Sequence, residues 1–180
     1  MGPLILVTPE LTARVDALAD ALRARGWRIA TAESCTGGLI AAACTAVAGS
    51  SDWFEAGWVT YSNAAKAAAI GVPAALIDAH GAVSAEVAAA MARGALLAAR
   101  VPLAVAVTGI AGPGGGSAEK PVGTVWVGLA WQAAGAADVR CRTECLHLDG
   151  DRASIRAQTL AYALDALTAA ARRGDGAPGA

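Results

Sequence analysis

The chain has 180 residues, of which 56% are hydrophobic and 4% aromatic, and its formal net charge is −1. This length predicts a single domain, with a core built mainly from Ala, Val, Leu and Ile. No apolar run approaches the roughly 20 residues that span a bilayer, and no basic cluster offers a face for nucleic acid. We therefore expect neither a membrane partner nor a nucleic-acid partner.

Signals for secretion and for metal binding are weak in this chain. The first 15 residues lack the basic flank and small-residue cleavage site of a signal peptide. Without such a signal, the four cysteines (Cys35, Cys44, Cys141 and Cys145) favour reduced thiols over disulfides. Cys141 and Cys145 have the spacing of half a zinc site, but no second pair of ligands completes it. We expect a cytoplasmic protein with no metal and no other cofactor.

Helix and strand patterns alternate along the first part of the chain. Thr8 and Pro9 predict a helix start, and apolar residues at helical spacing carry that helix towards Gly26. After it, the patterns predict a strand at 27–32, a helix at 39–47, a strand at 58–61, a helix at 63–70 and a long helix at 84–100. An apolar run at 103–107 is typical of a fully buried strand.

The second part of the chain contains two consecutive strands. Residues 109–121 are rich in Gly and Pro and predict irregular structure, followed by strands at 122–131 and 139–148 and a helix at 152–171. The tail, 174–180, is expected to be disordered, which leaves one domain over 1–173. Together these elements predict an α/β fold, a three-layer α/β/α sandwich with a mixed, mostly parallel sheet.

Polar residues gather in three loops that each follow a predicted strand. These loops are 33–38, 61–66 and 108–120. Ligands of such folds bind beyond the carboxyl ends of the strands, where loops and helix amino termini converge. We therefore expect one common site built from all three loops.

Ser34 is the candidate nucleophile of that site. It lies at a strand-to-helix turn followed by Thr36, Gly37 and Gly38, where backbone N–H groups can stabilise an oxyanion. The simpler interpretation is that Ser34 only caps the following helix. The neighbouring Cys35 is an alternative nucleophile, but no His is placed beside it and a buried thiol is commonly inert.

A serine nucleophile needs a base, and two candidates follow the second strand. His80 and His147 are poorly placed in the sequence, so a Ser–His–Asp triad has little support. A buried Lys66 could have a lowered pKa and act as base, or could favour a tyrosinate at Tyr61 that accepts the serine proton. Taken singly, each residue has a simpler structural interpretation.

The third loop, 108–117, can turn successive N–H groups towards an anion. It has neither the Walker A pattern nor a clear dinucleotide fingerprint. Lys120 and Arg152 are candidate phosphate partners, with an ordinary surface charge as the simpler interpretation of both.

Three separated motifs resemble the CinA C-terminal-domain family. They are TAESCTGG at 31–38, GWVTYSNAAK at 57–66, and TGIAGP at 108–113 continuing to KPVGTV at 120–125. The resemblance extends from about the first helix to the last. Characterised members of this family are nicotinamide-nucleotide amidases, and this chain is most similar to their stand-alone form.

The resemblance implies a fold, a reaction and a set of site residues. The reaction is hydrolysis of nicotinamide mononucleotide to nicotinic acid mononucleotide and ammonia, a step of pyridine-nucleotide salvage that needs no metal. The resemblance implies Ser34 as nucleophile, Tyr61 as its proton acceptor and Lys66 as the completing base. It implies substrate contacts, or oxyanion contacts in the case of Thr108, at Glu33, Thr36, Gly37, Thr108, Gly109, Gly112 and Arg152. Gly114 to Gly116 depart from the acidic residue that relatives often carry in this loop.

Two other functions stay open on the sequence, and so does the oligomeric state. The chain could be a nucleotide-binding module without turnover, or an amidase for another pyridine or nucleotide amide. A homodimer is expected, with Trp53 and Phe54 as candidates for the contact surface and a core role as the alternative for both.

Overall fold

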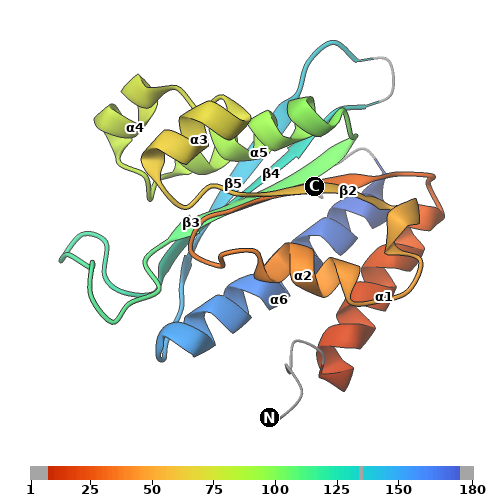
Figure 1. The fold of residues 1–180 in the computed structure, drawn as a ribbon, viewed down its shortest axis with the longest axis horizontal. Helices are drawn as coiled ribbons and strands as arrows, with labels where there is room; N and C mark the ends of the chain where they lie inside the picture. The colour runs from red at the N-terminus through yellow and green to blue at the C-terminus, as the bar shows by residue number, and fades with distance from the viewer. Residues whose placement is uncertain (1–7, 134–135, 175–180) are drawn as a thin grey trace.

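The computed structural model describes residues 8–133 and 136–174, so the predicted disordered tail lies outside the described residues apart from Gly174. Its centre is a five-stranded sheet with the strand order β2-β1-β3-β4-β5 (Figure 1). The strands are β1 (Ile29–Glu33), β2 (Phe54–Val59), β3 (Leu103–Gly109), β4 (Thr124–Trp131) and β5 (Arg140–His147).

The sheet is mixed, as the sequence predicted. β1 pairs in parallel with both β2 and β3, whereas β4 pairs antiparallel with β3 and with β5. Only β4 therefore runs against the other four strands. The two late strands are adjacent in the sheet because a short connection can join only antiparallel neighbours.

Helices cover both faces of this sheet (Figure 1). One face carries α1 (Pro9–Arg23), α2 (Leu39–Thr45) and α6 (Arg152–Arg173), and the other carries α3 (Asn63–Ile70), α4 (Ala74–His80) and α5 (Ala85–Ala99). A short 3-10 turn, η1 (Ser50–Asp52), precedes β2. The predicted α/β/α sandwich is confirmed.

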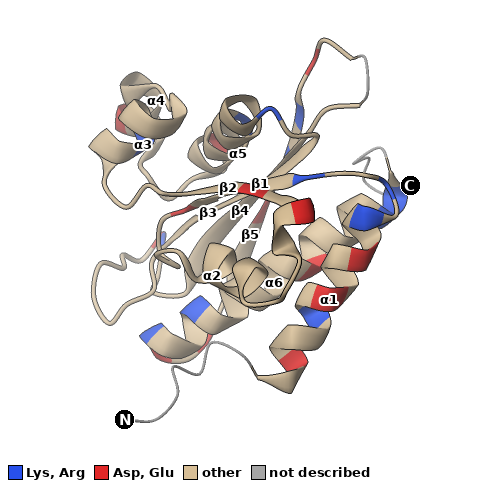
Figure 2. Cartoon of the chain, turned by 45° about the vertical axis from the view of Figure 1, so that its right-hand side comes forward, with Lys and Arg blue, Asp and Glu red and all other residues tan. Residues whose placement is uncertain are grey.

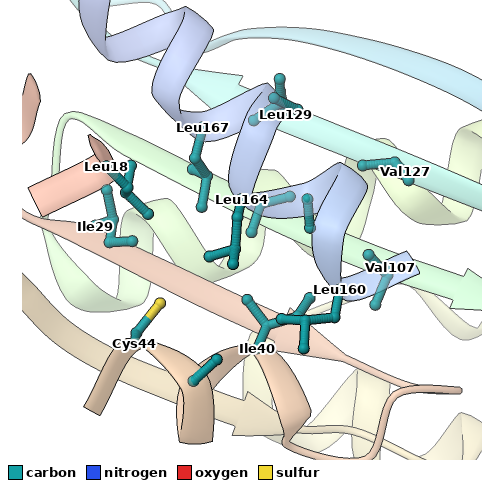
Figure 3. Close-up of a cluster of buried hydrophobic side chains, with 14 of the residues drawn as sticks. Leu18, Ile29, Ile40, Cys44, Val107, Val127, Leu129, Leu160, Leu164 and Leu167 are labelled. Atoms are coloured by element: carbon teal, nitrogen blue, oxygen red, sulfur yellow. The ribbon is translucent and has the colours of Figure 1, made fainter. Parts of the chain in front are cut away.

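Each face of the sheet has its own apolar core. Figure 3 shows Leu160, Leu164 and Leu167 of α6 packed towards Val107 and Leu129 of the sheet. On the opposite face, Ala-rich α5 packs on alanines of β1 and β3, so helix and sheet approach closely. Among the described residues, no helix is long and apolar enough to cross a membrane.

Three sequence predictions need correction. The second strand spans Phe54–Val59 rather than 58–61, because its pairing with β1 begins at Phe54 and ends at Val59. Helix α4 was not predicted, since it is one short segment between Pro73 and Gly81. Trp53 is fully buried in the core, so it cannot form part of a contact surface, and the core alternative is the correct one.

Candidate active site

The three predicted loops meet at the carboxyl edge of β1, β2 and β3. The N–H of Ser34 donates to the carbonyl oxygen of Val107 at 3.0 Å, which joins the end of β1 to the end of β3. Lys66, on α3, places its Nζ 3.2 Å from the Oγ of Ser34. The sequence separation of 32 residues between the two is bridged by the parallel pairing of β1 and β2.

Lys66 is almost completely buried, with a relative exposure of 1%. Its Nζ lies 3.0 Å from the carbonyl oxygen of Thr60 and 3.3 Å from that of Tyr61, in addition to the Ser34 contact. Among the described residues, it forms no salt bridge. Burial lowers the pKa of Lys66 from its ordinary value, because the low-dielectric surroundings disfavour the charged form.

Three oxygens around one nitrogen fit either the three N–H groups of an ammonium or the two N–H groups and one lone pair of a neutral amine. A neutral lysine has two N–H groups and one lone pair, and two of the three neighbouring oxygens are carbonyls that can only accept. In the neutral form, which burial favours, the two N–H groups pair with Thr60 and Tyr61, and the lone pair faces the hydroxyl of Ser34. This arrangement suits proton transfer from Ser34 to Lys66.

The turn that carries Ser34 is fixed by the carboxylate of Glu33. Its Oε2 accepts from the Thr36 hydroxyl at 2.7 Å and from the N–H groups of Gly38 and Ile40, both at 3.0 Å. Its Oε1 accepts from the N–H of Ala41 at 2.8 Å. Helix α2 begins at Leu39 with Gly38 as N-cap, so Ser34 does not cap it, and the capping interpretation is wrong.

Two backbone N–H groups directly after Ser34 remain without an oxygen acceptor among the described residues. The N–H of Gly37 donates to the carbonyl oxygen of Ser34, and that of Gly38 to Glu33. In the described part of the chain, the N–H groups of Cys35 and Thr36 have no oxygen acceptor. Gly37 and Gly38 have φ angles of 60° and 97°, which a glycine adopts without strain. The two residues that follow the Ser34 hydroxyl in the turn thus carry N–H groups without an oxygen acceptor, which are the candidates for an oxyanion hole.

Cys35 is a poor alternative nucleophile in this environment. Its side chain is buried, and burial raises the pKa of the thiol to about 11. Since the thiolate is the reactive form, little of it is present near neutral pH. The local chemistry favours Ser34.

Tyr61 lies apart from the Ser34–Lys66 pair. Its side chain is 60% exposed, and its hydroxyl accepts a hydrogen bond from Nη2 of Arg152 at 3.1 Å. Only its backbone oxygen contacts Lys66. Nη1 of the same arginine donates to the carbonyl oxygen of Gly112 at 2.9 Å, so Arg152 links the second loop to the glycine-rich loop.

Thr108 and the glycines of the third loop, which were predicted to contact substrate, have hydrogen-bond and packing partners within the protein. The hydroxyl of Thr108 donates to the carbonyl oxygen of Ala82 at 2.8 Å. A Cβ on Gly109 would lie 2.7 Å from the side chain of Val125, and one on Gly112 equally close to that of Val122, so close packing requires glycine at both. Lys120 donates to the carbonyl oxygens of His80 and Val83. As substrate contacts, Thr108, Gly109 and Gly112 stay predictions, as do Glu33, Thr36 and Gly37.

A cavity of about 620 Å³ opens between the glycine-rich loop and the start of α6. Its lining includes Ala111 and Pro113 from the loop and Arg152 and Arg156 from the helix. Figure 2 shows the positive charge at this end of α6. Sequence reasoning assigned no role to Arg156, although its spacing of four residues from Arg152 places both on one face of a helix. Its Nη2 donates to the carbonyl oxygen of Thr36 at 2.8 Å, next to Ser34.

Known proteins resemble this chain along most of its length. The model of the CinA C-terminal domain matches residues 11–171. The nicotinamide-nucleotide amidohydrolase PncC of Escherichia coli strain K12 is 52% identical over 158 residues, which cover 88% of this chain and 93% of that protein. The protein of the same name from Pseudomonas putida is 52% identical over 157 residues, covering 87% and 94%.

Solved structures agree with these sequence relationships. A CinA superfamily protein from Klebsiella pneumoniae has a TM-score of 0.82 and 35% identity, covering 91% of this chain and 98% of that one. The competence/damage-inducible protein CihA from Agrobacterium tumefaciens has a TM-score of 0.78 and 45% identity, covering 89% and 93%. The chain therefore belongs to the CinA C-terminal domain family.

Proposed function

We propose that this protein hydrolyses the carboxamide of nicotinamide mononucleotide, giving nicotinic acid mononucleotide and ammonia in pyridine-nucleotide salvage. Two observations support the proposal. Relatives that are about half identical carry the name nicotinamide-nucleotide amidohydrolase. The 3.2 Å contact between Ser34 and buried Lys66, which has no carboxylate partner in the described part of the chain, supplies a nucleophile and a base for amide hydrolysis.

The first half of the reaction forms an acyl-enzyme. Neutral Lys66 takes the proton of Ser34 as Oγ attacks the carboxamide carbon. The N–H groups of Cys35 and Thr36 hold the resulting oxyanion, an interaction worth about 3 kcal/mol per donor in comparable sites. The carbon–nitrogen bond then breaks, and the proton on Lys66 passes to the leaving nitrogen, which departs as ammonia.

The second half of the reaction returns the enzyme to its starting state. Lys66, neutral again, takes a proton from water as the water oxygen attacks the acyl carbon. The bond to Ser34 Oγ breaks, and Lys66 returns the proton to that oxygen. The direct Lys66–Ser34 contact supports Lys66 as the proximate base in both halves, in place of the predicted transfer to Tyr61.

The cavity beside Arg152 and Arg156 is the proposed site for the phosphate of the substrate. Guanidinium groups suit phosphate oxygens, and the amino terminus of α6 adds a favourable dipole. The carboxylate of Asp151, which lines the same cavity, already accepts from the N–H of Ser154, so the two guanidinium groups are the proposed donors to the phosphate. Binding the remote phosphate would orient the carboxamide towards Ser34.

The predicted homodimer and cytoplasmic location form part of this proposal. Since Trp53 is buried, a dimer would have to use other surface, and exposed Val59 and Tyr61 offer apolar area near the edge strand β2. Sedimentation velocity of the purified protein measures the oligomeric state.

The decisive experiment measures ammonia release from nicotinamide mononucleotide by the wild type, Ser34→Ala and Cys35→Ala. We expect wild type and Cys35→Ala to be active and Ser34→Ala to lose activity by a factor of at least about 10³. Circular dichroism confirms that all three proteins are folded.

Other outcomes would reject the proposal in different ways. Activity retained in Ser34→Ala but lost in Cys35→Ala would identify a thiol enzyme. A folded wild type that binds the nucleotide without releasing ammonia would be a binding module. Activity confined to a different pyridine or nucleotide amide would retain the chemistry but change the substrate.

A further inference from the structure

Thr36, two residues after Ser34, is held on two sides. Its hydroxyl donates to Oε2 of Glu33 at 2.7 Å, and its carbonyl oxygen accepts from Nη2 of Arg156 at 2.8 Å. Its own N–H has no oxygen acceptor among the described residues and is one of the two free donors beside Ser34. The Thr36 carbonyl belongs to the peptide shared with Gly37, and the N–H of that peptide donates to the carbonyl oxygen of Ser34 at 3.1 Å, so these contacts together close the turn on which the Thr36 N–H lies.

Arg156, which bonds to the carbonyl oxygen of Thr36, is far from Thr36 in the sequence. It lies 120 residues from Thr36, in the second turn of α6, and it is half-buried. A Cβ added to Gly37 would lie 3.6 Å from its Nη2, so the guanidinium rests directly on the exposed side of the turn. Among the described residues, its buried Nε has no hydrogen-bond partner. One charged hydrogen bond thus carries the connection from α6 to the Ser34 turn.

We propose that Arg156 is a positioning residue for catalysis: it holds the Thr36–Gly37 peptide, whose N–H closes the turn on the carbonyl oxygen of Ser34, and so fixes the segment that carries the N–H groups of Cys35 and Thr36. The inference rests on the proposed function, because it assumes an oxyanion formed at Ser34. Hydrogen bonds with a charged donor are short and roughly twice as strong as neutral ones. Such a bond suits a turn in which two glycines give the backbone little stiffness of its own.

The main alternative for Arg156 is direct contact with the phosphate. Both arginines line the same cavity, but their hydrogen bonds differ. Arg152 bonds to Tyr61 and Gly112, which lie on loops around the cavity, whereas Arg156 bonds to the turn of the nucleophile. A phosphate contact acts on substrates that carry a phosphate, whereas a positioning contact acts on every substrate that reacts at Ser34.

The experiment compares Arg156→Met and Arg156→Lys with Arg152→Met, one helical turn earlier on the same cavity. Each protein is assayed with nicotinamide mononucleotide and with nicotinamide riboside, which has the same carboxamide and no phosphate. A third assay follows acylation of Ser34 by 4-nitrophenyl acetate, a small ester that needs neither subsite. Thermal melting checks that each variant is folded.

We expect Arg156→Met to lower kcat on the nucleotide, kcat/KM on the riboside and the rate of ester acylation by a similar factor of roughly 10 to 100. Arg156→Lys should recover part of this loss, since an ammonium can still donate to the Thr36 carbonyl. Arg152→Met should mainly raise the KM for the nucleotide. This is the pattern expected for loss of a phosphate contact, and the Arg156 variants are compared with it.

An Arg156→Met variant that raises only the KM for the nucleotide, with riboside and ester rates as in wild type, would overturn the inference. A wild type that releases no ammonia from the nucleotide would instead overturn the proposed substrate. In that case the ester assay still measures whether Arg156 controls the reactivity of Ser34.

Discussion

The nitrogen of Lys66 is surrounded by two carbonyl oxygens and one hydroxyl in a buried position. These three oxygens can accept from an ammonium, but among the described residues no carboxylate pairs with the nitrogen to compensate a buried charge. Burial favours the neutral form, and it lowers the pKa of Lys66.

Activity should depend on pH through this lysine. The base is the neutral form, so kcat/KM should rise with pH, level off above the lowered pKa of Lys66 and fall in acid as the amine is protonated. The rise should occur below the ordinary lysine value of 10.5. A pH profile of ammonia release from 5 to 10 checks this.

Replacement of Lys66 tests the same assignment. Lys66→Met keeps the apolar stem but removes the base, so kcat should fall by about 10² to 10⁴. Tyr61→Phe is the matched variant, because it removes only a hydroxyl that contacts Arg152. A smaller effect in Tyr61→Phe than in Lys66→Met supports Lys66 as proximate base, and the reverse order would restore the predicted role of Tyr61.

The carboxylate of Glu33 positions the whole of helix α2, because it accepts hydrogen bonds from the N–H groups at the amino terminus of that helix. The N-cap of this helix is Gly38, which has no side chain to accept a hydrogen bond. Glu33 reaches from the end of β1 and accepts from two N–H groups in the first turns of α2. Glu33 thereby ties the end of β1 to the start of α2, and the turn that carries Ser34 lies between these two elements.

Glu33→Gln should destabilise the protein for this reason. An amide keeps one oxygen but turns its NH₂ group towards backbone donors, so about 2 to 3 kcal/mol of unfolding free energy should be lost. Glu55→Gln is the control, since Glu55 forms a half-exposed ion pair with Arg28 that is worth at most about 1 kcal/mol. Urea unfolding of both variants gives the comparison.

Helix α3, which carries Lys66, is positioned by its contact with α5. A Cβ on Gly94 of α5 would lie 2.0 Å from the carbonyl oxygen of Ile70 at the end of α3. The two helices can approach this closely only with glycine at residue 94.

Gly94→Ala should therefore cost stability and activity together. An alanine would usually stabilise a helix interior, but here the overpacking should cost roughly 1 to 3 kcal/mol and move Lys66 away from Ser34. Gly114→Ala is the matched control, because a Cβ there meets no atom within 4 Å. Thermal melts and ammonia release, measured on both variants, separate the two effects.

At the scale of the whole molecule, the site joins layers on opposite faces of the sheet. Lys66 comes from the α3 side, whereas Arg152 and Arg156 come from the α6 side (Figure 1). A ligand that spans the cavity and the Ser34 turn would contact both layers. Its binding should therefore stabilise the folded protein as a unit.

Substrate should raise the melting temperature of the inactive Ser34→Ala variant. At 100 times the dissociation constant the expected stabilisation is about 2.7 kcal/mol. Arg152→Met combined with Ser34→Ala should show a smaller shift at the same concentration. Equal shifts in the two proteins would exclude a phosphate contact at Arg152.

Local patterns in the sequence determined the elements and the loops of the site. Helix starts at Thr8, Ser84 and Asp151 follow from side chains that accept from N–H groups three residues on. The buried strand β3 follows from its continuous apolar run. Because ligands of such folds bind at the carboxyl ends of strands, the sequence alone groups the three loops into one site.

Only the tertiary structure decided what each polar side chain does. A sequence shows residue types and spacing, whereas partners 32 or 120 residues apart depend on strand order and helix packing. Thus Lys66 rather than Tyr61 contacts Ser34, Glu33 braces α2, and Arg156 reaches the turn of the nucleophile. The length of the edge strand β2 has the same origin. It extends to Phe54 because it pairs with β1 from that residue onward, and this pairing depends on the fold rather than on the residue types in β2.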